Sequence, residues 1–561
     1  MTIHFGTDGW RAVMSDTFTF TNLRLVAQAI ADAVASPEWI NGTTLEVKPD
    51  PRKMVVGFDT RFLSDRYATE VARVLAGNGF TVLLAQADAP TPVISHAVLA
   101  NNAIGGVMIT ASHNAPRYNG VKLKSASGGS ALPEQCRRVE IYLNDNEERG
   151  RGPNLMDVDQ ARELKLIQRF NPIPAYYEHL RKLIDCDIIA ENPQRFVIDS
   201  MYGSGRGVIR GFLQGSGCEI SEIRGEMNPG FGGVHPEPIR HYLGALAGAI
   251  GAGMGNFGIA TDGDADRIGA MDERSNFVDP HKIMSLALRY LVEKRGLTGS
   301  VVRTVSTTRM IDRLAKQYGL TLHETPVGFN HIADYMLKEE VLIGGEESGG
   351  ISFQGHIPEG DGVLMGLLLI EIVASSGTTL YELVEDLLSE VGPAFYERRD
   401  IRLRHPVSKK AMTQRLQDEL ARARRAGNGL CVLLLDLDFF KHVNDMFGHA
   451  AGDTVLQEVA ALLKSSLRST DLMGRWGGEE FLFVLPDTDR KGGMRAAEKL
   501  RKALEKHAFL DGQLIGCPTG SFGALALETD REYDVSRVLE IADNSLYQAK
   551  AEGRNRVVFG G

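Results

Sequence analysis

The feature that most constrains the fold is an alternation of short apolar segments with amphipathic ones over the first several hundred residues. Residues 67–77 carry apolar side chains at helical spacing and end on a glycine. Strands that alternate with helices predict α/β layers with mainly parallel sheets. The units recur without a fixed short period, which excludes a solenoid. Five apolar segments are predicted to be buried strands: residues 54–58, 81–84, 105–109, 196–198 and 257–260.

Composition and charge narrow the class of protein. The length of 561 residues predicts about four domains at roughly 150 residues each. A net charge of -10 argues against a general nucleic-acid binder. The five cysteines lie far apart and form no C-x-x-C pair, which predicts a reducing, cytoplasmic location without a zinc site. No signal peptide is visible, and the apolar stretch 243–260 predicts a helix and a strand, not a membrane span.

Three polar loops each follow a predicted buried strand, where ligands bind in doubly wound folds. In Thr110-Ala-Ser-His-Asn-Ala-Pro116, Ser112 beside His113 is either a nucleophile or a helix cap, and from these residues alone the cap is favoured. Asp262, Asp264 and Asp266 occupy alternate positions of a glycine-containing loop, a pattern that can converge on one hard cation. In the loop at 344–350, Glu346 and Ser348 are candidates to bind sugar hydroxyls, which by itself is a weak indication.

Together these motifs resemble the α-D-phosphohexomutases, the phosphoglucomutases and phosphomannomutases, from about Phe5 to about Arg404. The resemblance implies that Ser112 carries a phosphoryl group and that Asp262, Asp264, Asp266 and Ser112 bind Mg2+. It also implies passage of the phosphoryl group to a hexose phosphate, through a bisphosphate that turns round and returns a phosphate to the serine. It further implies catalytic roles for Arg11, His113, Arg267 and Lys122, of which Lys122 is the candidate acid/base. Glu346 and Ser348 match the family's sugar-binding loop.

Two departures from that family stand out. Asn330 stands where the family has a phosphate-binding lysine. The family's fourth domain carries an Arg-x-Ser-(Gly/Asn)-Thr-Glu-Pro-like loop that grips the non-reacting phosphate, and this sequence has none. A mutase holds its substrate in two orientations by that phosphate, so we expect low kcat/KM.

The last 150 residues carry a second set of motifs. In Gly477-Gly-Glu-Glu-Phe481, two glycines allow a tight hairpin tip where Glu479 and Glu480 repel each other and favour a cation; a solvated acidic turn is the alternative. Asp436 ends an apolar strand, and the Leu437 carbonyl lies beside it. Asn444 and Asp453 are candidates to bind a guanine edge or to cap helices. Lys550 and Arg554, one helical turn apart, suit a triphosphate or a plain basic helix end.

This tail resembles the GGDEF-type diguanylate cyclases from about Thr413 to Val558. The resemblance implies that two GTP condense to cyclic di-GMP and pyrophosphate across a two-fold homodimer. Asp436, the Leu437 carbonyl, Glu479 and Glu480 then belong to the Mg2+ site, with Glu479 also the base for the ribose hydroxyl. Asn444 and Asp453 contact guanine, and Arg468 and Asp471 form the allosteric product-inhibition site. The implied phosphate contacts are Phe439, Phe440, Lys441, Lys550 and Arg554.

The sequence therefore predicts a phosphohexomutase-like body whose fourth domain is replaced by a GGDEF domain. The predicted domains are 1–150, 151–256, 257–395 with both the metal and sugar loops, a linker at 396–412, and the GGDEF domain at 413–561. The first hypothesis is a diguanylate cyclase whose body binds hexose phosphate and Mg2+. The alternatives are a mutase with the tail as a nucleotide sensor, or a natural or engineered chimera with neither activity.

Overall fold

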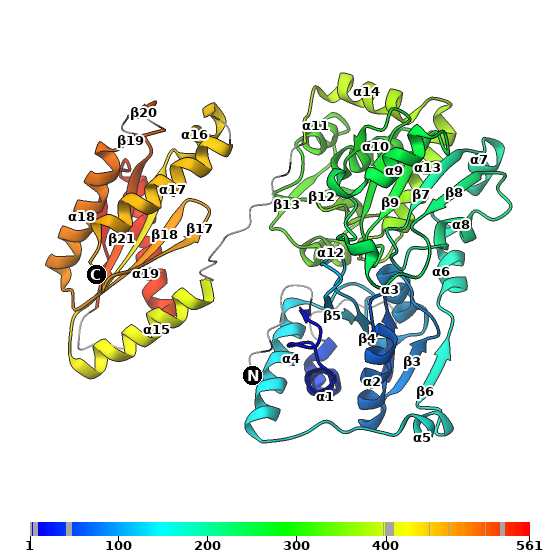
Figure 1. Cartoon of the computed structure of the whole chain (residues 1–561), viewed down its shortest axis with the longest axis horizontal. Coiled ribbons are helices and arrows are strands. Elements are labelled where there is room, and N and C mark those ends of the chain that lie inside the picture. The colour runs from blue at the N-terminus through cyan, green and yellow to red at the C-terminus, as the bar shows by residue number, and fades with distance from the viewer. Residues whose placement is uncertain are drawn as a thin grey trace. The chain divides into compact units, whose positions relative to one another are not determined.

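The computed structural model describes residues 3, 9–40, 48–396, 398, 409–447, 449–468, 470–510, 512–515, 517–527 and 533–560. The chain divides into two compact units, Met1–Glu397 and Arg398–Gly561 (Figure 1). The first unit holds three sheets and the second holds one large sheet, each flanked by helices, which confirms the predicted α/β class.

The first sheet is mixed, with order β1-β5-β4-β2-β3-β6. Its strands β4, β2, β3 and β6 run parallel, and at one edge the β4–β5 and β5–β1 pairs are antiparallel. The helix α1 begins after Thr19, whose hydroxyl accepts a hydrogen bond from the Asn22 N–H. The strands are β1 (Trp10–Val13), β2 (Asp50–Phe58), β3 (Thr81–Ala85), β4 (Ala103–Ile109), β5 (Tyr118–Ser125) and β6 (Ile167–Phe170). The helices are α1 (Phe20–Ala35), η1 (Pro37–Ile40), α2 (Ser64–Gly77), α3 (Thr91–Ala100), α4 (Pro133–Glu148) and α5 (Val158–Glu163).

The second sheet has order β11-β10-β9-β7-β8, with β9, β7 and β8 parallel and the β9–β10 and β10–β11 pairs antiparallel. The domain boundary predicted between residues 256 and 257 falls inside this sheet, because β9 pairs with β7 and the metal loop joins β9 to β10. The strands are β7 (Arg195–Asp199), β8 (Glu219–Ile223), β9 (Phe257–Thr261), β10 (Ile268–Met271) and β11 (Phe277–Val278). The helices are α6 (Ile173–Leu180), α7 (Cys186–Glu191), α8 (Val208–Phe212), η2 (Phe231–Gly233), η3 (Arg240–Tyr242) and α9 (Gly244–Gly251).

The third sheet has order β13-β12-β14-β15 and ends on an antiparallel edge strand. The helix α13 is buried on nearly all sides and begins after Asp361, whose side chain accepts a hydrogen bond from the Leu364 N–H. The strands are β12 (Ser300–Thr304), β13 (Leu322–Thr325), β14 (Val341–Gly345) and β15 (Ile351–Phe353). The helices are α10 (Pro280–Glu293), α11 (Met310–Gln317), α12 (Phe329–Lys338), α13 (Gly362–Ser376) and α14 (Leu380–Val391).

The sheet of the second unit has order β17-β18-β16-β21-β22 (Figure 1). Successive residues of the central strand β16 point to opposite faces and supply two cores. Leu433 and Leu435 belong to one core, and Val432 and Leu434 belong to the other with Leu416. The strands of this sheet are β16 (Leu430–Asp438), β17 (Leu472–Gly477), β18 (Glu480–Pro486), β21 (Thr519–Ala526) and β22 (Val557–Phe559). The strands β19 (Ala508–Phe509) and β20 (Leu514–Ile515) form a separate antiparallel pair. The helices are α15 (Lys409–Ala426), α16 (Phe440–Phe447), α17 (His449–Ser466), α18 (Arg490–Lys506) and α19 (Val535–Ala551).

Among the described residues, no single helix has both the length and the apolar composition to cross a membrane. In the part of the chain that the structure describes, α13 and α14 have sufficient length and apolar composition when taken together, but the two helices are bent by 88° at the break between them.

Candidate active sites

The metal loop and the sugar loop of the first unit line one cavity of about 190 Å³, and the serine loop contacts the metal loop through Ser112 and Asp262. Each follows the carboxyl end of a strand: the serine loop follows β4, the metal loop follows β9, and the sugar loop follows β14. Arg11, Lys122, Asp266, Arg267 and Glu346 line the cavity. These side chains span more than 300 residues of the sequence, and the fold brings them to one site.

Ser112 lies in a turn that leads into β5, not at the start of a helix. Its Oγ donates a hydrogen bond of 2.9 Å to Asp262 Oδ2, and it lies 3.3 Å from His113 Nδ1. Burial, together with Arg267 and Arg11, lowers the pKa of His113 well below its usual value. The serine hydroxyl is thus directed at the metal loop.

Asp262, Asp264 and Asp266 have carboxylate oxygens that all lie within 4.8 Å of one another. Lys122 Nζ lies 2.9 Å from Asp264 Oδ2 and 2.6 Å from Asp266 Oδ2. Burial raises the pKa of Asp262 well above its usual value, and the two neighbouring carboxylates add to this. For Asp264, burial also favours the neutral form, but Lys122 and the Thr91 hydroxyl outweigh it and hold the pKa below its usual range.

The acidic loop fits a hard divalent cation. The Oδ1 atoms of Asp264 and Asp266 are buried and make no hydrogen bond among the described residues. Buried oxygens normally have a partner, and carboxylates are the ligands that Mg2+ prefers. Gly263 allows the close approach of this loop to the serine loop, because a Cβ there would lie 2.5 Å from the Ser112 carbonyl oxygen.

The other predicted side chains surround this centre. Arg11 Nη1 donates to Asn114 Oδ1 at 2.9 Å, and the Arg267 N–H donates to Asp262 Oδ1 at 3.2 Å. Glu346 accepts the Gly328 N–H at 2.9 Å and the Ser348 hydroxyl at 3.4 Å. Burial raises the pKa of Glu346 to about 7, against the nearby Arg267 charge.

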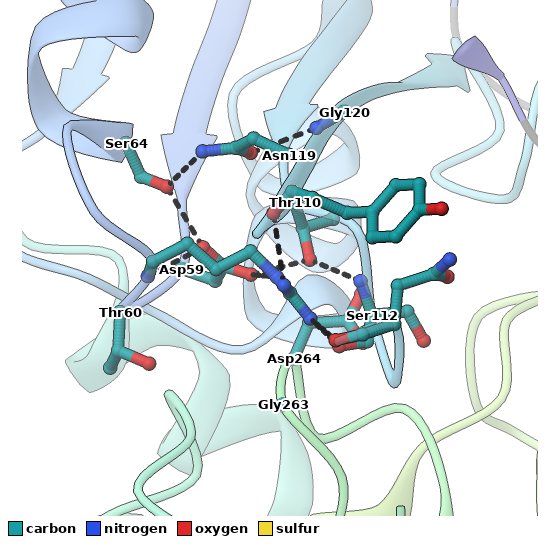
Figure 2. Close-up of polar contacts among 12 residues, drawn as sticks. Asp59, Thr60, Ser64, Thr110, Ser112, Asn119, Gly120, Gly263 and Asp264 are labelled. Atoms are coloured by element: carbon teal, nitrogen blue, oxygen red, sulfur yellow. Dashed lines mark hydrogen bonds and ion pairs between the residues drawn. The ribbon is translucent and has the colours of Figure 1, made fainter. Parts of the chain in front are cut away.

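Sequence reasoning missed a buried ion pair beneath the serine loop. Asp59 and Arg61 follow β2, their side chains are fully buried, and Arg61 Nε lies 3.1 Å from Asp59 Oδ2. Figure 2 shows Asp59 and Thr110 beside Ser112, with Gly263 and Asp264 of the metal loop next to them. An aspartate directly after a buried strand was the available signal, but it is also common in ordinary turns.

The second unit brings another group of predicted residues together at the end of β16. Glu479 lies in the turn between β17 and β18, and Glu480 pairs in register with Asp436. The Leu437 N–H donates to the Glu479 carbonyl at 3.3 Å. Asp436 lies inside the strand, not after it. Burial raises its pKa, and Glu479 and Glu480 add to the rise while Lys550 opposes it. This carboxylate set suits a hard cation.

The predicted basic groups reach the same end of β16. Lys550 Nζ lies 2.8 Å from Asp436 Oδ2, and the Arg554 guanidinium carbon lies 5.1 Å from the centre of the Phe439 ring. Lys550 and Arg554 do not share a helix, because α19 ends at Ala551 and Arg554 has a left-handed φ of 63°. The turn after α19 therefore carries Arg554 over Phe439.

A further carboxylate, which sequence reasoning did not single out, holds that turn. Asp438 is buried and accepts hydrogen bonds from the Ser521 hydroxyl at 2.6 Å, the Thr519 hydroxyl at 2.8 Å and the Asn555 N–H at 3.0 Å. It thereby joins β16, β21 and the residue after Arg554. Its position two residues after Asp436 was the only signal in the sequence.

Some of the remaining candidates of this unit lie among the described residues and others do not. Phe440 is buried at the start of α16, whereas Phe439 is exposed. Arg468 and Asp471 contact each other through Arg468 N–H to Asp471 Oδ2 at 2.9 Å. The predictions for Lys441, Asn444 and Asp453 concern side chains that lie outside the described residues.

Comparison with known families matches both units. Three consecutive models, phosphoglucomutase/phosphomannomutase α/β/α domains I, II and III, match residues 2–150, 174–275 and 279–391. The model of the diguanylate cyclase GGDEF domain matches residues 407–556. A phosphoglucosamine mutase of Acetivibrio thermocellus is 31% identical over 385 residues, which cover 68% of this chain and 80% of that protein. This chain belongs to the phosphoglucomutase/phosphomannomutase family. Its C-terminal part is a GGDEF domain.

Other mutases give the same picture. A phosphoglucomutase of Komagataeibacter xylinus is 30% identical over 425 residues, covering 71% of this chain and 74% of that protein. A structure from Thermus thermophilus, solved as a candidate phosphomannomutase, is 35% identical with a TM-score of 0.63, covering 70% of this chain and 84% of that one. Both resemblances predicted from the sequence, to the mutases and to the GGDEF domains, are confirmed.

Proposed function

We propose that the GGDEF domain is a diguanylate cyclase that condenses two GTP to one cyclic di-GMP and two pyrophosphates. The observation that carries the proposal is the meeting of Asp436 and the Glu479–Glu480 tip with Lys550 and Arg554 at one end of β16. Carboxylates beside cations are what a metal-bound triphosphate requires. GTP and hexose phosphates are cytoplasmic metabolites, so we place the protein in the cytoplasm.

In this proposal the side chains have separate tasks. Glu479 takes the proton of the ribose 3'-hydroxyl, and Lys550 and Arg554 hold the triphosphate against the chain segment of Phe439, Phe440 and Lys441. Asn444 and Asp453 bind guanine, and Arg468 and Asp471 bind the product. Mg2+, held by Asp436, the Leu437 carbonyl, Glu479 and Glu480, would offset phosphate charge and lower the pKa of the attacking hydroxyl. Each domain holds one GTP, so two chains must form a homodimer.

Liquid chromatography with mass spectrometry of cyclic di-GMP, after incubation of the full chain with GTP and Mg2+, tests the proposal. We expect product from the wild type and none above background from Glu479→Ala. Glu540→Ala is the matched control, because Glu540 is an acidic residue on α19 that pairs with Arg537. Absence of product from a folded dimer, or equal product from both variants, would refute it.

We further propose that the mutase domains bind hexose phosphate and transfer a phosphoryl group through Ser112. The specific support is the 2.9 Å contact of Ser112 Oγ with Asp262 and the two buried oxygens of the acidic loop that make no hydrogen bond among the described residues. Arg11, Arg267 and Lys122 neutralise the moving phosphoryl group, Lys122 also exchanges protons, and Glu346 and Ser348 hold sugar hydroxyls. Mg2+ on the acidic loop would add to that neutralisation.

We expect this transfer to give poor overall isomerisation, because Asn330 replaces a cation and the sequence has no fourth-domain phosphate loop. The alternative is a working mutase in which the GGDEF domain is a nucleotide sensor. We test it by measuring the interconversion of glucose 1-phosphate and glucose 6-phosphate with the wild type and with Ser112→Ala. Fast, Ser112-dependent interconversion together with no cyclic di-GMP would favour that alternative. Neither activity from folded protein would favour the chimera.

A further inference from the structure

We propose that the buried Asp59–Arg61 ion pair is a positioning device that sets the backbone of Ser112 for phosphoryl transfer. The inference rests on the proposed role of Ser112 as phosphoryl carrier. Neither side chain lines the active-site cavity, and both are fully buried. They therefore act on the reaction through the loop and not through the substrate.

Arg61 uses all five of its N–H donors: one goes to Asp59, three go to the serine loop, and one goes to Tyr118 at the start of β5. Its Nε bonds Asp59 Oδ2 at 3.1 Å. Its Nη2 donates to the carbonyls of Ser112 at 2.5 Å and Asn114 at 2.6 Å, and its Nη1 donates to those of Ala115 and Tyr118 at 3.0 Å each. A guanidinium can span four carbonyls because it is a rigid planar fork, which an ammonium group is not.

Asp59 acts on the other side of Ser112 through Thr110. The Thr110 hydroxyl donates to Asp59 Oδ2 at 2.7 Å and accepts the Ser112 N–H at 2.8 Å. The ion pair therefore fixes both the N–H and the carbonyl of the residue that carries Oγ. Figure 2 shows this arrangement of Asp59, Thr110 and Ser112.

Ser112 needs such support, because its φ of 51° lies in the left-handed region that non-glycine residues avoid. A loop released from the pair would relax, and Oγ would leave its position 2.9 Å from Asp262. Stability alone is a weak reason for the pair, because a buried ion pair often contributes no more than well-packed apolar side chains would. What the pair adds here is geometry at the nucleophile.

The test is the half-reaction at Ser112, measured by intact mass in single turnovers of the full chain with glucose 1,6-bisphosphate and Mg2+. In this step the Ser112 Oγ–phosphorus bond forms and the bond from phosphorus to the sugar oxygen breaks. The sugar oxygen gains the proton that Ser112 loses. The rate constant and the bisphosphate concentration at half saturation are determined separately.

Arg61→Lys keeps the charge but cannot span four carbonyls, and Thr110→Val removes the hydroxyl that links Asp59 to Ser112. We expect each to lower the rate constant about 100-fold, the effect of misplacing a reacting group by roughly 1 Å, with half saturation within about threefold of wild type. Thr110→Ser restores the hydroxyl and should return the rate to within about threefold of wild type. Ser64→Ala is the matched control, because its hydroxyl bonds the opposite oxygen of Asp59, at 2.9 Å.

Three outcomes separate the claims. A rate loss in Arg61→Lys and Thr110→Val, but not in Thr110→Ser or Ser64→Ala, supports positioning. Equal rates in all folded variants, or losses that follow thermal stability and appear equally in Ser64→Ala, overturn positioning while Ser112 remains the carrier. If the wild type takes up no phosphoryl group, the proposed role of Ser112 is refuted and the positioning proposal falls with it.

Discussion

We predict that two of three clustered imidazole rings, His96 and His179, make the stability of the mutase domains depend on pH. His96 on α3 stacks on His179 of α6, with ring centres 4.7 Å apart. His179 Nε2 lies 3.0 Å from Nδ1 of His356, which precedes α13. On the far side, His356 lies 3.0 Å from Asp361, whose Oδ2 also accepts the Tyr176 hydroxyl. The cluster joins elements of all three mutase domains.

Burial is the main cause that lowers the pKa of His96 to about 4 and that of His179 to about 3. His356 and Lys182 act in the same direction and Asp361 opposes them. The unfolded chain therefore binds protons near pH 6.5, where the folded chain does not. The contribution of His96 and His179 to folding stability is fully present above that pH and is lost as pH falls towards 4. For His96 alone, a pKa lowered from 6.5 to about 4 corresponds to about 3 kcal/mol.

His96→Phe tests this magnitude, because a phenyl ring keeps the stacking surface and cannot bind a proton. The ring borders a cavity of about 510 Å³, which leaves room for it. Urea unfolding is followed by tryptophan fluorescence between pH 7.5 and 4.5 in a Trp476→Phe background, so that only the buried Trp10 and Trp39 of the mutase domains report.

We expect the wild type to lose stability more steeply than His96→Phe as pH falls, by up to about 1.4 kcal/mol per pH unit for the one proton removed. Equal slopes in the two proteins would refute the assignment of this pH dependence to His96.

Three further predictions follow from the two sites. Gly263→Ala places a Cβ 2.5 Å from the Ser112 carbonyl oxygen and should lower the rate of phosphoryl transfer to Ser112 at least about tenfold. The control Gly248→Ala on α9, where the added Cβ meets open space, should leave this rate unchanged, and equal rates in the two variants would contradict the account. Lys550→Met should lower cyclic di-GMP formation at least about tenfold by removing the cation 2.8 Å from Asp436, with Lys502→Met on α18 as control, and a normal rate would show that Lys550 has no such role. Arg468→Ala should relieve product inhibition and leave the initial rate within about twofold, because the Arg468 side chain is exposed and its contact with Asp471 uses the backbone N–H, which alanine keeps. Persistent inhibition would exclude that site.

The elements with strong local patterns could be predicted from the sequence. The apolar run at 430–435 became β16, and Gly477 and Gly478 became the hairpin approach that presents Glu479. The sequence also predicts that the three aspartates at alternate positions converge. One carboxylate oxygen of each lies within 4.8 Å of the others, because their loop directly follows a buried strand.

The features that were missed depend on long-range pairing or on backbone geometry. The boundary at 256/257 divides a sheet because the pairing of β9 with β7, across about 60 residues, leaves no local pattern. The sequence predicts Lys550 and Arg554 one helical turn apart, but α19 ends at Ala551. Gly553 has a φ of 115°, and the chain turns there before it reaches Arg554. Arg61 of the Asp59–Arg61 pair donates to backbone carbonyls more than 50 residues away. Every residue has the same carbonyl, so the residue types of the serine loop do not indicate this contact.

The central claim is that two GGDEF domains of this chain together make cyclic di-GMP. Its most direct test is the rate of cyclic di-GMP formation per chain, measured with saturating GTP and Mg2+ over a wide range of protein concentration. We predict that the rate per chain rises with concentration as homodimers form and that Glu479→Ala abolishes it at every concentration. Folded protein that forms no product at any concentration, or whose rate is unaffected by Glu479→Ala, would contradict the account.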